Sequence, residues 1–288
     1  MTSARLRLVL GCIAGLGLIA LGVAANQLPA AGANGLLHPT RRKAIVAPPS
    51  MCQAATFEGE AIALEGWRCH ATGTRRGTLI YLHGVADNRS SGVSAIERFT
   101  KRGFDVVAYD SRAHGESAGD ICTYGFFEKQ DLHRVLDTVD QGPIVLLGTS
   151  LGGAVALQEA ERDPRVAAVI AAETFSDLRT VATERAPFFF TSGIIRRAFQ
   201  LAEQQGHFQV DAVSPVTAAA AIRIPVLLIH GAADSETSPD HSRRVLAALT
   251  GPKRLILVPG ARHSESLRGD VWAEIERWLD EALRSARG

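Results

Sequence analysis

A serine with the surroundings of a nucleophile lies near the middle of the chain. Ser150 sits in Gly148-Thr149-Ser150-Leu151-Gly152, directly after the apolar run Ile144–Gly148 and before a helical stretch. This G-x-S-x-G pattern, in a strand–turn–helix context, exposes a serine hydroxyl at the end of a buried strand. Unpaired N–H groups at the start of the next helix point to the same place. A Gly-Ser turn without chemistry has the same pattern, so the interpretation depends on partner residues.

Candidate partners follow two later apolar runs. A nucleophilic serine needs a base, and that base needs a carboxylate to orient it. Asp234 follows Pro225–His230, and His263 follows Arg254–Val258. Because parallel strands deliver their carboxyl ends to one edge of a sheet, these residues can converge on Ser150. The chain order Ser, Asp, His is that of one known triad arrangement.

A backbone loop completes the set. Tyr81-Leu82-His83-Gly84-Val85 ends another apolar run, and the loop beyond it can aim an N–H at the serine. We predict the N–H groups of Val85 and Leu151 as oxyanion donors. Losing one such donor typically costs about 2.7–4 kcal/mol of transition-state stabilisation.

The elements that must position these residues alternate along the chain. Strands are predicted at Ala54–Phe57, Ile62–Cys69, Thr78–His83, Asp105–Tyr109, Ile144–Gly148, Val166–Ala171, Pro225–His230 and Arg254–Val258. Helices are predicted at Ser91–Arg102, Glu128–Asp140, Leu151–Arg162, Pro239–Leu249 and Leu267–Ser285. Continuous apolar runs that alternate with helices indicate the α/β class with a mainly parallel sheet.

Residues 173–222 interrupt this alternation and are too long for a plain connection. They include a possible helix, Ile194–Gln205, and the triplet Phe188-Phe189-Phe190. We predict an inserted cap. The phenylalanines either line an acyl pocket or pin the cap to the core, and the second interpretation is favoured.

From about residue 54 to residue 285 the chain resembles the α/β-hydrolase superfamily. The segments that carry the resemblance are Leu82–Gly84 (LHG), Tyr109–Ser117 (YDSRAHGES), Thr123–Leu132 (TYGFFEKQDL), Gly148–Gly153 (GTSLGG), His230–Asp234 (HGAAD) and Gly260–Glu265 (GARHSE). They look most similar to the serine-aminopeptidase, monoacylglycerol-lipase and prolyl-oligopeptidase-like branch. Members usually show D-x-R-G-H-G-x-S, and Ala113 replaces the first glycine here.

The resemblance implies an eight-stranded, mostly parallel sheet flanked by helices, with a small helical cap after the sixth strand. It implies Ser150 as nucleophile, His263 as general base and Asp234 as the acid that orients the base. Other histidines and acids are interpreted as structural or surface residues, with the acids kept as weaker rivals to Asp234: His83, His114, His207, His230, His241, Asp110, Asp120 and Asp177. No metal-ligand spacing and no nucleotide motif is evident, so no metal and no cofactor is predicted.

Composition places the chain among ordinary globular proteins. Its 288 residues suit one or two domains, and 46% hydrophobic with 21% charged residues excludes a disordered chain. With 31 Lys and Arg against 30 Asp and Glu, the net charge is +1, which argues against nucleic acid as a partner. Oligomeric state is left open.

The N-terminus carries a membrane-targeting pattern. Arg5 and Arg7 precede the 18-residue uncharged run Leu8–Ala25. At about 1.5 Å per residue this run spans roughly 27 Å, close to a bilayer's hydrocarbon thickness. An uncleaved signal anchor is favoured over a signal peptide cleaved at a site such as Ala31-Gly32-Ala33. We expect a membrane-anchored protein with its globular part outside the cytoplasm, in the periplasm, or a secreted protein if the leader is cleaved.

Two parts of the chain are therefore predicted. Residues 1–50 are a leader plus tether, and residues 51–288 are the hydrolase domain, with its cap at about 173–222. If Glu58 pairs with Ala63 across the first hairpin, Cys52 faces Cys69. A disulfide there would suit an oxidising compartment, and two buried thiols are the alternative.

The predicted function is serine hydrolysis through an acyl-enzyme, with carboxylic esters or thioesters of lipids or other small acyl compounds as the favoured substrates. A serine peptidase or aminopeptidase is the enzymatic alternative. A non-catalytic binding module on the same fold is the alternative from another class, and transfer of the acyl group to an alcohol is also open.

Overall fold

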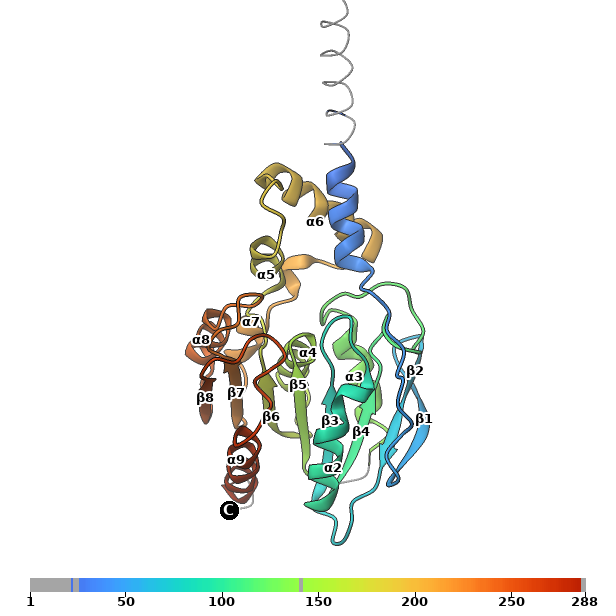
Figure 1. The fold of residues 1–288 in the computed structure, drawn as a ribbon, viewed down its shortest axis with the longest axis vertical. Coiled ribbons are helices and arrows are strands. Elements are labelled where there is room, and N and C mark those ends of the chain that lie inside the picture. Colours follow the sequence, from blue (N-terminus) through green and yellow to red (C-terminus); the bar gives the residue numbers. More distant parts are fainter. Residues whose placement is uncertain (1–21, 23–25, 140–141, 286–288) are drawn as a thin grey trace, which may run out of the picture.

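The structure is a computed structural model that describes residues 22, 26–139 and 142–285. Its centre is one sheet of eight strands in the order β1-β2-β4-β3-β5-β6-β7-β8 (Figure 1). The strands are β1 (Cys52–Glu58), β2 (Ala63–Cys69), β3 (Gly77–Leu82), β4 (Phe104–Tyr109), β5 (Ile144–Thr149), β6 (Val166–Ala172), β7 (Val226–Gly231) and β8 (Lys253–Val258). The pairs β1–β2 and β2–β4 are antiparallel and all other neighbours are parallel. The predicted eight-stranded, mostly parallel α/β sheet is confirmed.

Successive residues of the central strands face two separate cores. Tyr81 and Leu147 point into one core, and Ile80 and Leu146 point into the other. The first core is covered by α2 (Val93–Lys101), which follows the short 3₁₀ helix η1 (Arg89–Gly92), and by α9 (Val271–Ser285); the second is covered by α3 (Glu128–Leu136), α4 (Leu151–Ala160) and α8 (Asp240–Ala248). Both faces of the sheet are therefore buried, as the continuous apolar runs indicate.

A cap follows β6 and rises above the carboxyl ends of the parallel strands (Figure 1). It consists of α5 (Leu178–Glu184), α6 (Ser192–Gly206), the 3₁₀ turn η2 (Val210–Ala212) and α7 (Pro215–Ala219). The helix predicted at Ile194–Gln205 is confirmed as α6. Phe199 and Phe208 form a third core with residues from the N-terminal part of the chain.

Residues 26–37 are helical and belong to this cap, which corrects the predicted tether. Ala33 and Leu37 are fully buried in the third core, and Figure 1 shows the blue helix beside α6. The chain is also tied down just beyond the helix, where the Arg41 guanidinium donates to Ser117 O at 2.6 Å. Pro29 and Gly32 lower the helix propensity, and tertiary packing outweighs this cost.

Most of the apolar run Leu8–Ala25 lies outside the described residues. Within residues 22, 26–139 and 142–285, none of the helices combines the length and apolar character needed to cross a membrane. The signal anchor and its orientation therefore stay predictions.

The first hairpin carries a disulfide between Cys52 and Cys69. Glu58 lies opposite Ala63 in the β1–β2 pair, which is the register that the predicted pairing requires. The predicted disulfide is confirmed. Cys122 is a buried free thiol.

Candidate active site

Ser150 lies on a sharp turn between β5 and α4. Its φ of 49° is in the left-handed region, which costs a residue with a side chain roughly 1–2 kcal/mol. A Cβ added to Gly148 would lie 2.2 Å from backbone atoms of Gly152, and one added to Gly152 would lie 2.1 Å from Leu82 O. The turn therefore requires both glycines, as the sequence indicates. It holds the Ser150 side chain at the carboxyl edge of the sheet.

The structure brings the three predicted side chains together in one hydrogen-bonded chain. Nε2 of His263 lies 3.1 Å from Oγ of Ser150, and Nδ1 of His263 lies 2.7 Å from Oδ2 of Asp234. Because the Asp234 carboxylate can only accept, Nδ1 carries the proton, and Nε2 is left as an acceptor for the Ser150 hydroxyl. The arrangement can remove a proton from Ser150 as the hydroxyl attacks.

Asp234 is held as an anion by its surroundings. Its Oδ1 accepts the backbone N–H groups of Glu236 and Thr237, both at 2.9 Å. Burial raises the pKa of Asp234, but hydrogen bonds from His230 and His263 outweigh burial and keep its pKa well below the usual range. The carboxylate is thus ionised at neutral pH and can stabilise a protonated His263.

Glu173 is a functional candidate that the sequence analysis missed. It is buried directly after β6, and its carboxylate accepts three N–H groups of the loop that carries His263: Ser264 at 2.7 Å, Glu265 at 3.1 Å and Ser266 at 2.8 Å. The available signal was an acid at the carboxyl end of a strand, the same signal that identified Asp234. Glu173 fixes the position of His263 relative to β6.

The two predicted oxyanion donors flank the serine. Leu151 is the first residue of α4, and Val85 lines the same cavity as Ser150. Within the described residues, neither backbone N–H donates a hydrogen bond. Both N–H groups are therefore without a protein acceptor, which leaves them available to an oxyanion.

His83 orders the loop that bears Val85. Its Nδ1 donates to Gly84 O at 2.7 Å, and its Nε2 accepts the N–H of Ser111 at 2.9 Å. Burial lowers the pKa of His83, so the ring is neutral. A Cβ on Gly84 would lie 3.5 Å from that of Ser150, which shows how closely this loop approaches the serine.

Of the other candidates, only His230 contacts the hydrogen-bonded chain: its Nε2 lies 3.3 Å from Oδ2 of Asp234, and the ring also contacts Ser242 and Thr237. Asp110 pairs with Arg89. His114 is buried, and burial lowers its pKa to about 4. His207, at the end of α6, and Asp120 are exposed. Asp177 caps α5 by accepting the Thr180 N–H. Ala113 adopts a φ of 61°, the left-handed conformation for which the usual glycine is suited.

The structure corrects the interpretation of His241 as a surface or cap residue. It is fully buried in α8, where Nδ1 accepts the N–H of Ser176 at 3.0 Å and Nε2 contacts Glu184 at 2.8 Å. It joins α8 to the cap, because the helix turns this polar face toward α5.

The interpretation of Phe188–Phe190 also changes. Phe188 is 100% exposed and Phe189 is 51% exposed, so neither pins the cap to the core. Phe190 instead approaches Gly32 of the helix 26–37. The three rings form a connected row at the tip of the cap, with neighbouring centroids 5.4 Å apart.

One group in the described part of the chain has the composition of a metal site. The ligand atoms of His133, Glu159 and Asp163 lie within 4.8 Å of one another. They sit at the far end of α4, about 15 Å from Ser150 for a helix of this length. Burial raises the pKa of Glu159 to about 7, and Arg165 pairs with Asp163. We interpret the group as an ion-pair cluster, and the absence of a metal from the reaction stays a prediction.

A cavity of about 310 Å³ adjoins Ser150 and His263. Its lining includes the charged residues Asp87, Glu236 and Arg185. A substrate carbonyl can therefore enter next to the serine, between side chains that differ in charge.

Comparison with known proteins agrees with this architecture. Residues 77–192 match the model of a family described as alpha/beta hydrolase fold. The uncharacterized protein YfhR of Escherichia coli K12 is 33% identical over 206 residues, which cover 68% of this chain and 67% of YfhR. This chain belongs to the α/β-hydrolase family. A second relative is the uncharacterized protein YqkD of Bacillus subtilis. It is 30% identical over 199 residues, which cover 66% of this chain and 65% of YqkD.

Solved structures with low sequence identity share the fold. The Pyrococcus furiosus esterase Pf2001 superposes with a TM-score of 0.65 at 21% identity, covering 85% of this chain and 96% of the esterase. A Pyrococcus horikoshii acylaminoacyl peptidase superposes with a TM-score of 0.66 at 17% identity, covering 81% of this chain and 41% of the peptidase. At these sequence identities, the two structures show only that this chain shares their fold.

Proposed function

We propose that this protein is a serine hydrolase that cleaves carboxylic esters or thioesters through an acyl-enzyme. The observation that carries the proposal is the continuous chain from Ser150 Oγ through His263 to Asp234. A silent binding module would not need this ionised, hydrogen-bonded arrangement beside an open cavity.

In the proposed mechanism, Ser150, His263 and Asp234 act in successive steps. Ser150 Oγ attacks the substrate carbonyl while Nε2 of His263 takes the hydroxyl proton. Asp234 stabilises the resulting imidazolium, and the N–H groups of Val85 and Leu151 hold the oxyanion. The imidazolium protonates the leaving group, and His263 then activates a water molecule that hydrolyses the acyl-enzyme.

A fluorophosphonate probe tests this proposal. Wild-type protein is expected to be labelled, and Ser150→Ala is expected to lose all labelling because the attacking oxygen is gone. Ser192→Ala, an exposed serine at the start of α6, is the matched control and should label as wild type does. Full labelling of Ser150→Ala would reject the assignment.

An aminopeptidase is the second candidate, and the catalytic cavity gives a reason to keep it. Asp87 and Glu236 line that cavity, and carboxylates in this position can pair with the α-ammonium group of a peptide. Comparison of p-nitrophenyl esters with aminoacyl-anilides separates the two functions, since only a peptidase favours the anilides.

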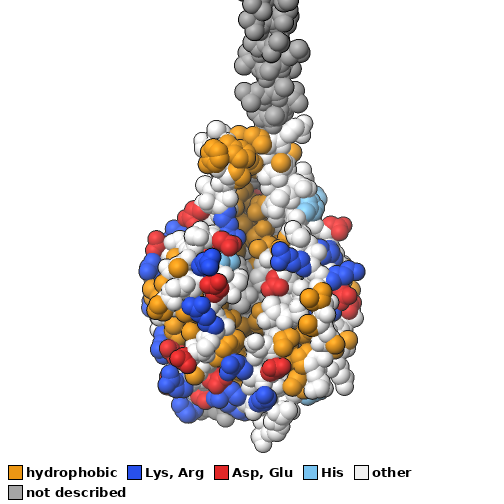
Figure 2. Space-filling view, viewed as in Figure 1, with side chains coloured by type: hydrophobic (Ala, Val, Ile, Leu, Met, Phe, Trp, Pro, Cys, Tyr) orange, Lys and Arg blue, Asp and Glu red, His pale blue; other side chains and the backbone are white. Residues whose placement is uncertain are grey.

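We also propose that the protein acts at a membrane, attached through Leu8–Ala25. Two features support this. The run has the length of a bilayer span, and Phe188 and Phe189 expose aromatic surface at the tip of the cap. Figure 2 shows a hydrophobic group at the end of the molecule where residues 26–37 also lie.

A further inference from the structure

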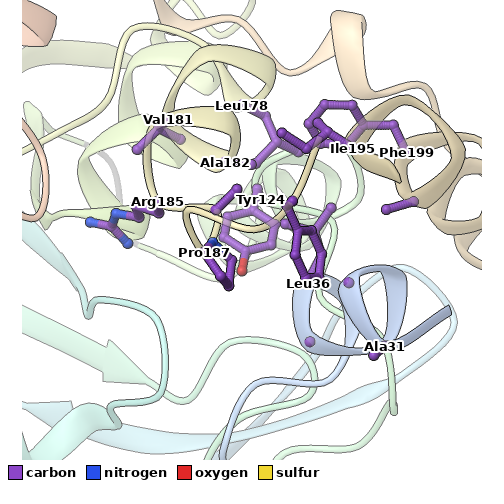
Figure 3. A pocket seen from close by; sticks show the side chains of 15 residues that line it. Ala31, Leu36, Tyr124, Leu178, Val181, Ala182, Arg185, Pro187, Ile195 and Phe199 are labelled. Atoms are coloured by element: carbon purple, nitrogen blue, oxygen red, sulfur yellow. The ribbon is translucent and has the colours of Figure 1, made fainter. Parts of the chain in front are cut away.

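The cap holds a second, half-open cavity of about 410 Å³, separate from the one named above. Most of its lining is apolar, and the residues that matter here are Leu36, Leu178, Val181, Pro187, Phe190 and Phe199 (Figure 3). Sites for small ligands commonly have about 300–1,000 Å³ and a mostly apolar lining with few polar groups. The cavity therefore has the size and chemistry for an apolar ligand.

One wall of this cavity is the helix formed by residues 26–37. Ala31, Gly32, Gly35 and Leu36 line it, and their spacing places them on one face of the helix. Ala33 and Leu37 are buried on a different face of the helix, and their burial holds the helix against the cap. Small residues on the cavity side keep the space open: a Cβ added to Gly35 would meet no atom within 4 Å.

Arg185 joins this cavity to the catalytic one. It contributes to the lining of both. Its Nε donates to Glu236 O at 2.9 Å, and its guanidinium also donates to the Thr237 hydroxyl. Thr237 in turn donates its N–H to Asp234, so Arg185 is tied to the loop of the proposed catalytic acid. Figure 3 shows Arg185 at one side of the cavity and Phe199 at the other.

We propose that this cavity binds the acyl chain of the substrate, with the helix 26–37 as part of the binding site. The inference rests on the proposed ester or thioester hydrolysis at Ser150. An acyl chain would lie along the apolar lining, and its carbonyl end would pass Arg185 toward the serine. Each buried CH2 group improves binding about fourfold, so the cavity selects long chains over short ones.

Substitutions in the helix wall test the inference in the full-length chain, held in lipid nanodiscs. Ala31→Phe and Gly35→Leu each place a larger side chain in the cavity. Both variants are expected to lower the ratio of kcat/KM for p-nitrophenyl dodecanoate to that for p-nitrophenyl acetate by at least tenfold. Ala30→Phe is the matched control, because Ala30 is exposed and adjoins Ala31 without lining the cavity. Its ratio should equal the wild-type ratio.

Fatty-acid binding gives a second readout that needs no hydrolysis. Fluorescent cis-parinaric acid should bind the Ser150→Ala protein, and addition of Ala31→Phe should weaken this binding at least tenfold. If wild type cleaves acetate but Ala31→Phe and Gly35→Leu retain both the wild-type ratio and wild-type affinity, the inference is overturned. If no ester is cleaved while the fatty acid binds and Ala31→Phe weakens binding, the proposed hydrolysis fails and the binding site stands.

Discussion

At the scale of single residues, Glu173 shows how a side chain outside the Ser150–His263–Asp234 chain can control the chemistry. Its carboxylate receives three successive N–H groups of the loop that carries His263. Those groups fix where the imidazole lies, and the imidazole must stay within hydrogen-bond reach of Ser150. A displacement of about 1 Å can cost a factor of about a hundred in rate.

The first prediction therefore concerns Glu173→Gln. The amide can accept fewer of these N–H groups, and its own NH2 opposes them, so His263 is displaced. We expect kcat for ester hydrolysis to fall by about a hundredfold, with a smaller change in KM. Glu265→Gln is the control on the same loop, where the half-exposed carboxylate receives the Arg262 N–H. Equal losses in both variants would show that Glu173 has no special positioning role.

Residue patterns predicted the nucleophile turn, Asp234 and His263 because each is local: an apolar run, a turn and a polar residue directly after it. The partners of Glu173 could not be read in this way. They are backbone groups more than ninety positions along the chain, and backbone groups leave no signature in residue type. His241 was misjudged for a related reason, since only the docking of the cap shows which face of α8 is covered.

At the scale of elements, the β1–β2 hairpin is held covalently. The Cys52–Cys69 bond closes a loop of 17 residues at the edge of the sheet. In the chain-entropy model a loop of this size stabilises the fold by about 3 kcal/mol. Disulfides persist in oxidising compartments, and the location of the globular part outside the cytoplasm stays a prediction.

We predict that Cys52→Ala/Cys69→Ala lowers the free energy of unfolding by about 2–4 kcal/mol, measured by urea denaturation. The single variant Cys122→Ala removes a buried thiol that is not part of the bond, so reductant should lower its free energy of unfolding by as much as it lowers that of wild type. Peptide mapping without reductant that finds Cys52 and Cys69 both free would contradict the bond itself.

The strands were predicted from sequence more accurately than the helix ends. Most of the central strands are apolar runs. Helix α9 starts at Val271 rather than at Leu267, because residues 267–270 form turns in which Gly269 adopts a φ of 48°. The helix 26–37 escaped prediction altogether. Its prolines and glycines resemble a linker, and only burial of Ala33 and Leu37 shows why it folds.

At the scale of the whole molecule, three features share one end: the residues that follow Leu8–Ala25, the exposed phenylalanines and the proposed acyl-chain cavity. This arrangement predicts that membrane attachment depends on the apolar run. Arginine near the middle of a span costs about 2.5–3.5 kcal/mol. Leu16→Arg/Leu18→Arg should therefore release the protein from membranes on alkaline carbonate extraction, whereas wild type remains in the pellet.

Gln27→Arg provides the control for this extraction, because it adds a positive charge just beyond the run. It should stay with the membrane. If the double variant also stays, attachment through the run is wrong, and the exposed Phe188 and Phe189 become the next surface to substitute.

The position of Ala33 inside the cap has one more consequence. A signal peptidase that cut after Ala31-Gly32-Ala33 would divide the helix in the middle and carry away Ala31 and Gly32 from the cavity wall. The released form of the protein would keep Ser150, His263, Asp234 and the disulfide but would bind long acyl chains more weakly. Proteolytic maturation at that site would thus change the substrate selectivity of the protein as well as its location.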